Sequence, residues 1–160
     1  MKLLGEGFHW DELKVGDLFR TFGRTVTETD IVNFVTSVGM LESLFLDAEY
    51  RAAHSAIAER PAPAALVYAI AEGLTLNATG QGTGLAFLHM ELNVERPVMQ
   101  GDTIHVEIEV IEVRAAKKDN RGLVRTRNSI VNPRGEIVIT YTPLRLMSGS
   151  NQTDGEEQNA

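Results

Sequence analysis

The 160-residue sequence contains no cysteine, which excludes disulfide bonds, thiolate metal ligands and cysteine nucleophiles. It also has no apolar run near the ~20 residues that a membrane-spanning helix needs. The first residues, MKLLGEGFHWDEL, lack the long apolar stretch of a signal peptide. These absences lead us to expect a cytoplasmic protein.

Positive charge is scarce as well. Fifteen Lys and Arg residues stand against 22 Asp and Glu, for a net charge of −7, which disfavours nonspecific binding to nucleic acid. Part of the acidity lies in the last segment, residues 148–160, which has no large apolar residue and is expected to be a disordered tail. Residues 1–147 have the length of one domain. The four histidines lack the short spacings of a metal site, so no metal is expected.

The first half of the chain predicts one strand and two helices. Asp17–Val26 is typical of a strand. Thr27 and Asp30 then form a helix-start signal, and Gly39 is a good residue to end that helix. Asp47 can cap a second short helix that ends near residue 54.

The least polar segment is residues 64–78, which predicts one long helix. Its large apolar side chains recur at helical spacing and form one wide face. That face consists of Leu66, Val67, Ile70, Ala71 and Leu74. Glycines at 80, 82 and 84 end the helix.

After residue 84 the apolar period changes from 3.6 to 2, which predicts strands. The first, residues 84–98, is expected to break at Arg96-Pro97. A strand over 103–110 ends in a Val110-Ile111 doublet, which predicts a bulge. Two further strands, 123–131 and 136–146, are joined by a turn at 132–135.

This order of elements predicts an α+β hotdog fold. Strands joined by short connections are antiparallel, and a single sheet can bury one apolar helix only by curling around it. Such a layer leaves one sheet edge exposed, so we expect pairing into a homodimer.

The sequence resembles the MaoC-like (R)-specific enoyl-CoA hydratases over roughly residues 10–147. The resemblance lies in Thr27–Phe34 (TETDIVNF), in Arg60 before the long helix, in Gly82-Thr83-Gly84, and in residues 91–103 (ELNVERPVMQGDT). It implies the hotdog fold and, as activity, hydration of an enoyl-CoA thioester. Coenzyme A would then enter as part of the substrate, with no separate cofactor.

The resemblance fails at the residues that carry the chemistry. Between their first two helices, active members read approximately S-G-D-x-N-P-I-H-x-D. Here residues 38–47 read VGMLESLFLD, so Met40 stands in place of the catalytic Asp and Phe45 in place of the His. Neither side chain exchanges a proton. Where the family has R-I-A-H-G, this chain has residues 60–64, RPAPA.

A replacement site can still be predicted. Glu42 is the only ionisable side chain between Gly39 and Asp47, and an apolar setting would make it a general base. The N–H groups of Ala64 or Ala65, at a helix N-terminus, would bind the thioester oxygen. The residues expected to contact the substrate are Met40, Phe45, Arg60, Pro63 and Tyr68.

Each of these assignments has a simpler alternative: Glu42 as a solvent-facing loop residue, Arg60 as a surface charge, and Tyr68 as core packing. The basic residues near 117–127 either hold the phosphates of coenzyme A or form a solvated hairpin turn. They are Lys117, Lys118, Arg121, Arg125 and Arg127.

We therefore expect an acyl-CoA-binding protein that hydrates or dehydrates an enoyl-CoA through an atypical site. Two alternatives remain. One is a noncatalytic acyl-CoA-binding protein or partner subunit that pairs with an active, related hotdog subunit. The other is a hotdog thioesterase, because that fold also hosts hydrolases and a fold alone does not define a function.

Overall fold

The computed structural model describes residues 4–57, 59–117 and 119–150. The part of the predicted tail beyond residue 150 lies outside this range. Residues 148–150 are tied to the domain, because Gly149 N–H donates to Asn120 O and Ser150 N–H donates to the Asp11 carboxylate. None of the described helices is long and apolar enough to span a membrane.

One antiparallel sheet forms most of the molecule. Its strands are β1 (Leu18–Arg20), β2 (Arg24–Thr25), β3 (Gly84–His89), β4 (Leu92–Val94), β5 (Thr103–Ala115), β6 (Arg121–Val131), β7 (Ile137–Tyr141) and β8 (Leu144–Ser148). The order is β1-β5-β6-β7-β4, with β2 beside β5 and with β8 between β6 and β3. β7 and β8 therefore pair with successive parts of the same long strand, β6.

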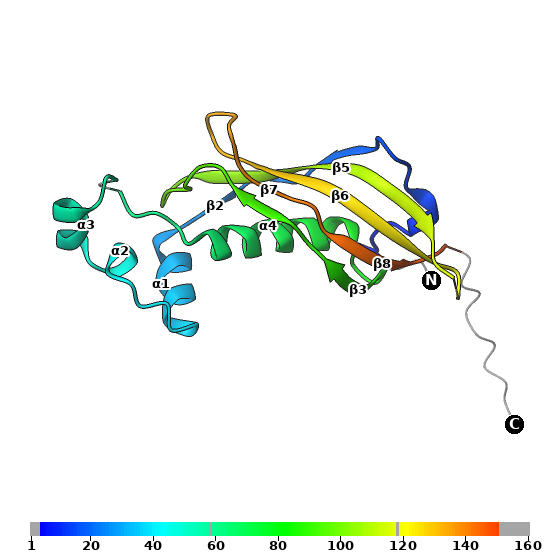
Figure 1. Cartoon of the computed structure of the whole chain (residues 1–160), viewed down its shortest axis with the longest axis horizontal. Helices are drawn as coiled ribbons and strands as arrows, with labels where there is room; N and C mark the ends of the chain where they lie inside the picture. Colours follow the sequence, from blue (N-terminus) through cyan, green and yellow to red (C-terminus); the bar gives the residue numbers. More distant parts are fainter. Residues whose placement is uncertain (1–3, 58, 118, 151–160) are drawn as a thin grey trace, which may run out of the picture.

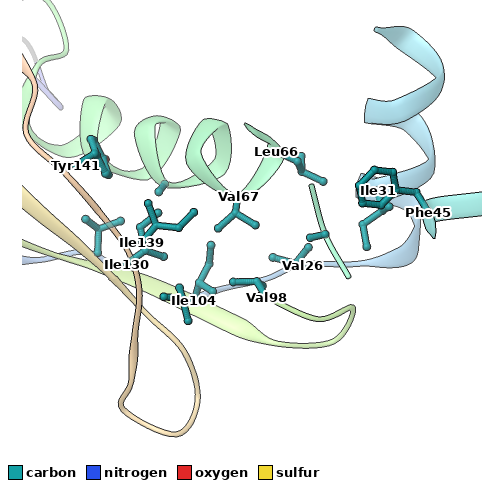
Figure 2. Packing of buried hydrophobic residues seen from close by; sticks show 14 of the residues in the cluster. Val26, Ile31, Phe45, Leu66, Val67, Val98, Ile104, Ile130, Ile139 and Tyr141 are labelled. Atoms are coloured by element: carbon teal, nitrogen blue, oxygen red, sulfur yellow. The ribbon is translucent and has the colours of Figure 1, made fainter. Parts of the chain in front are cut away.

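The sheet curls along one helix, α4 (Ala64–Thr79), as expected for a hotdog fold (Figure 1). The helix starts and ends where the apolar pattern predicts. Val67 and Ala71, 1% and 0% exposed, face a sheet surface that includes Ile104, Ile130 and Ile139 (Figure 2). Burying these side chains contributes roughly 1.5–3 kcal/mol for each large one.

The two predicted caps at the left-hand end of the molecule in Figure 1 are confirmed. Helix α1 (Glu28–Ser37) starts with a capping box, in which Thr27 Oγ1 accepts from Asp30 N–H and the Asp30 carboxylate accepts from Thr27 N–H. Helix α3 (Ala48–His54) starts at Asp47, whose carboxylate accepts from Tyr50 N–H at 2.9 Å. A one-turn helix between them, α2 (Ser43–Leu46), was not predicted.

Two of the strand predictions were only partly right. The run 17–26 is two strands, because Thr21 Oγ1, rather than a backbone carbonyl, accepts the hydrogen bond from Val106 N–H. The run 136–146 also splits, into β7 and β8 on either side of Pro143, which has no N–H to donate to the ladder.

The run 84–98 is interrupted at Arg96-Pro97 as predicted, because β4 ends at Val94. A further break at Met90-Glu91 was not predicted, and it lets β3 pair with β8 while β4 pairs with β7. The bulge prediction is confirmed, because the β5–β6 register shifts between Val110 and Glu112. The turn at 132–135 is also present, closed by a hydrogen bond from Gly135 N–H to Asn132 O.

The N-terminal segment closes the end of the curled sheet opposite α1. Gly7 and Phe8 donate backbone hydrogen bonds to Gln81 and Thr79, just past and at the end of α4. Phe8 and Leu13 then pack against a second apolar cluster that includes Val110 and Val124. This end of the α4–sheet interface is therefore covered by the chain itself.

Candidate functional site

The N-terminus of α4 is held in place by residues 98–102, which belong to the segment 91–103 that resembles the MaoC-like hydratases. Ala62 N–H donates to Val98 O, Gln100 N–H donates to Arg60 O, and Pro61 and Met99 form an antiparallel bridge. The Asp102 carboxylate in turn accepts from Met99 N–H at 3.0 Å. Residues 96–103 (RPVMQGDT) thus have a structural role, which is to position the start of α4.

The start of α4 is exposed at its first two residues, and the next two, Leu66 and Val67, are buried. Ala64 and Ala65 are exposed, whereas Pro63 before them is buried. The first N–H groups of a helix have no acceptor within the helix, and Pro63 supplies no capping side chain. Together with the positive end of the helix dipole, these groups suit a bound or developing negative charge.

Arg60 lies at this helix start, but its charge already has a partner. Its Nη1 lies 2.5 Å from Glu28 Oε1 in the first turn of α1. The Arg60 side chain is only 14% exposed, and that of Glu28 is 59% exposed. The pair joins the starts of α1 and α4, so Arg60 has a structural role here. Contact between Arg60 and a substrate stays a prediction.

The three candidate residues of the 39–47 loop, Met40, Glu42 and Phe45, differ in how far they are buried. Glu42 is exposed and occupies the N-cap position of α2, where its carbonyl accepts from Phe45 N–H. Met40 is 37% exposed, whereas Phe45 is 8% exposed and belongs to the core at the α1 end (Figure 2). Phe45 is therefore part of the hydrophobic core, and Glu42 faces solvent.

Tyr68 lies half-buried one turn into α4. Its ring meets that of Tyr141 edge-on, with 5.2 Å between the ring centroids. Burial raises the pKa of the Tyr68 phenol, and the nearby Glu72 carboxylate raises it further. The hydroxyl therefore stays protonated at neutral pH. The contact between the Tyr68 and Tyr141 rings supports the simpler assignment of Tyr68 to core packing.

A polar group inside the α4–sheet interface was not predicted. Glu72 on α4 forms an ion pair with Arg145 on β8, with side chains 13% and 10% exposed, and the Arg145 guanidinium lies 5.4 Å from the Phe87 ring centroid. Thr75 Oγ1 lies 3.4 Å from the Tyr141 hydroxyl. A charged residue within the least polar helix was the sequence signal for this group.

The basic residues near 117–127 are mostly paired with carboxylates. Arg125 Nε is 3.2 Å from Glu112, and Arg127 Nη1 is 2.7 Å from Glu109. Arg121 lies 3.9 Å from Asp119. Lys117 is exposed, and Lys118 lies outside the described residues. This pairing favours the structural alternative over a phosphate-binding cluster.

Comparison with known proteins defines the family. The family model described as FAS1-like, dehydratase domain region, matches residues 14–141. An (R)-hydratase from Pseudomonas aeruginosa is 30% identical, with a TM-score of 0.71 over 89% of this chain and 86% of that one. A MaoC-like dehydratase from Rhodospirillum rubrum is 26% identical, with a TM-score of 0.78 over 89% and 98%. The chain therefore belongs to the FAS1-like dehydratase-domain family of MaoC-like hotdog proteins.

A third structure shares the fold. A conserved hypothetical protein from Mycobacterium tuberculosis has a double hotdog fold and is 24% identical. The TM-score is 0.83, and the match covers 92% of this chain but 46% of that one, so this chain corresponds to about half of it. No curated protein sequence matches the chain.

Proposed function

We propose that this protein binds the thioester of an acyl-CoA at the N-terminus of α4 and takes part in the reversible hydration of an enoyl-CoA. The observation that carries the proposal is the exposed first turn of α4, fixed by the family-like segment in a chain of a dehydratase family. Ala64 or Ala65 N–H would donate to the thioester oxygen. The acyl group would then lie beside the helix start.

In the catalytic form of the proposal, Glu42 is the base. Its carboxylate takes one proton from a water molecule while the water oxygen bonds to the β-carbon of the enoyl group. The electron pair of the double bond moves toward the thioester, where the N–H groups of α4 stabilise the negative charge on oxygen. Glu42 then returns the proton to the α-carbon, so that one water has added across the double bond.

A noncatalytic subunit is the second candidate, and two observations favour it. Phe45 is packed in the core and Glu42 faces solvent, so the single chain holds no assembled proton-transfer pair at these positions. The chain also corresponds to about half of a protein with two hotdog units. In this form the protein would supply the binding surface, and a related partner would supply the catalytic residues.

Backbone amide NMR tests the binding proposal. Titration with butyryl-CoA, which has no double bond to hydrate, is expected to shift the Ala64 and Ala65 amide signals most. Free coenzyme A is the control, and it should leave these two signals nearly unchanged because it lacks the thioester carbonyl. Saturable shifts confined to β8, or no shifts at millimolar butyryl-CoA, would refute the site.

We also propose that the protein pairs through β3 with a second copy or with a related hotdog subunit. All six residues of β3 are exposed, and the strand pairs with β8 on one side. Three of its exposed side chains are large and apolar, namely Leu85, Phe87 and Leu88. An uncovered strand edge of this kind is a ready template for another strand.

Sedimentation tests the pairing. We expect a dimer of the purified chain at micromolar concentration, and Leu85→Lys with Leu88→Lys should convert it to a monomer. Val15→Lys is the control, since Val15 is also exposed and its neighbour Gly16 bonds to Val110 of β5, which β6 and β8 separate from β3. A wild-type chain that is monomeric alone and also when mixed with related hotdog subunits would contradict the proposal.

A further inference from the structure

The edge of the sheet at β1 carries exposed apolar side chains. β1 pairs with β5 on one side, and no strand of the described residues lies on its other side (Figure 1). Leu18 in β1 is 75% exposed, and Phe22, two residues past the end of the strand, is 93% exposed. Side chains so exposed contribute little to the core of the single chain. Apolar groups left open along a strand edge are typical of a surface that receives another strand.

The backbone of β1 presents hydrogen-bonding groups on that open edge. Asp17 O and Thr21 N–H, at either end of the strand, both take part in the hydrogen bonds to β5. Backbone groups of successive residues point to opposite sides of a strand, so those of Leu18 and Arg20 point away from β5. Their N–H and C=O groups are the ones that an added strand would pair with.

Arg20 gives this edge a positive charge. Its side chain is exposed and lines a hollow of about 380 Å³ on the outer face of β5 and β6. Glu107 is its register partner on β5, but Arg20 forms no ion pair with any residue that the structure describes. Glu107 Oε1 lies instead 3.5 Å from His105 Nε2. A charge in the middle of an edge strand disfavours pairing with segments that do not neutralise it, so a partner of this edge must bring a carboxylate to Arg20.

We propose that β1 binds an extended segment of another protein as an additional strand, and that this segment carries an acidic residue between two apolar ones. The acidic residue lies opposite Arg20, and the residues two positions before and after it lie opposite Leu18 and Phe22 on the same face. Backbone hydrogen bonds hold the segment, and the three side chains select its sequence. Strands β5, β6 and β8 separate this edge from β3, so the two surfaces are distinct.

Binding of the synthetic peptide TVSESIT tests the proposal. The wild type should bind it about threefold to tenfold more tightly than TVSKSIT, because opposite charges paired across strands stabilise and like charges destabilise. Arg20→Glu should reverse this preference. Bound TVSESIT should slow amide hydrogen exchange at Leu18 and Arg20 but not at Thr21, whose N–H already bonds to β5. Equal affinity for the two peptides, no saturable binding at millimolar TVSESIT, or slowed exchange confined to β3 would overturn the proposal.

The double variant Leu18→Thr with Phe22→Ser gives an independent readout. Both side chains are exposed, so the thermal midpoint should stay within about 2 °C of the wild type while binding of TVSESIT is lost. Val38→Ser is the control, because Val38 is exposed at the end of α1, outside the sheet, and this variant should bind as the wild type does. Unchanged peptide binding in the double variant would contradict the proposal. A wild-type dimer that the double variant converts to a monomer would assign the edge to a second copy instead.

Discussion

Glu42→Gln is expected to lower the rate of enoyl-CoA hydration by about 100-fold or more, if the protein is catalytic alone. The substitution keeps the shape of the side chain and removes the only ionisable group between Gly39 and Asp47, and general-base catalysis contributes about 10²–10⁴-fold. The measurement is the hydration rate with crotonyl-CoA. Binding of butyryl-CoA should hardly change, because Glu42 acts on water and does not bind the thioester oxygen.

Glu49→Gln is the matched control for this loss. Glu49 is exposed in the first turn of α3, a few residues from Glu42, and the change removes the same charge. Its rate should remain within about twofold of the wild type. Equal rates in Glu42→Gln and the wild type would remove Glu42 from the mechanism.

The largest expected effect on stability comes from the Glu72–Arg145 pair. Glu72→Leu leaves the Arg145 guanidinium largely buried without its carboxylate, and the free energy of unfolding should fall by about 3 kcal/mol. Replacing both partners with apolar residues removes the uncompensated charge. The double variant Glu72→Leu with Arg145→Met should therefore be more stable than the single variant, as measured by urea unfolding.

A matched surface pair separates this effect from loss of charge in general. Arg127 and Glu109 lie 2.7 Å apart on the exposed face, with side chains 51% and 40% exposed. Glu109→Leu should lower the free energy of unfolding by no more than about 1 kcal/mol. If Glu72→Leu lowers the free energy of unfolding by no more than Glu109→Leu does, burial does not make the Glu72–Arg145 pair more important for stability than a surface pair.

Features set by nearby residues could be predicted from the sequence. The caps at Thr27 and Asp47 depend on hydrogen bonds that span three residues, and α4 is defined by its own apolar content. The bulge after Val110 follows from a local doublet. Pro143 is likewise a local signal for the split between β7 and β8, because proline cannot donate to the ladder.

Features that depend on tertiary packing could not be predicted. The break of the first strand needs Thr21 to meet Val106, which lies 85 residues away in sequence. The environment of Glu42 depends on how its loop packs, and sequence proximity to Phe45 did not place the two side chains together.

The central claim, that this hotdog protein acts on an enoyl-CoA by adding water, is tested most directly by analysing the products formed from crotonyl-CoA. The purified protein should convert it to 3-hydroxybutyryl-CoA with the thioester intact. Release of free coenzyme A would identify a thioesterase instead. Unchanged crotonyl-CoA, together with saturable binding of butyryl-CoA, would contradict catalysis by this chain alone and identify the noncatalytic subunit.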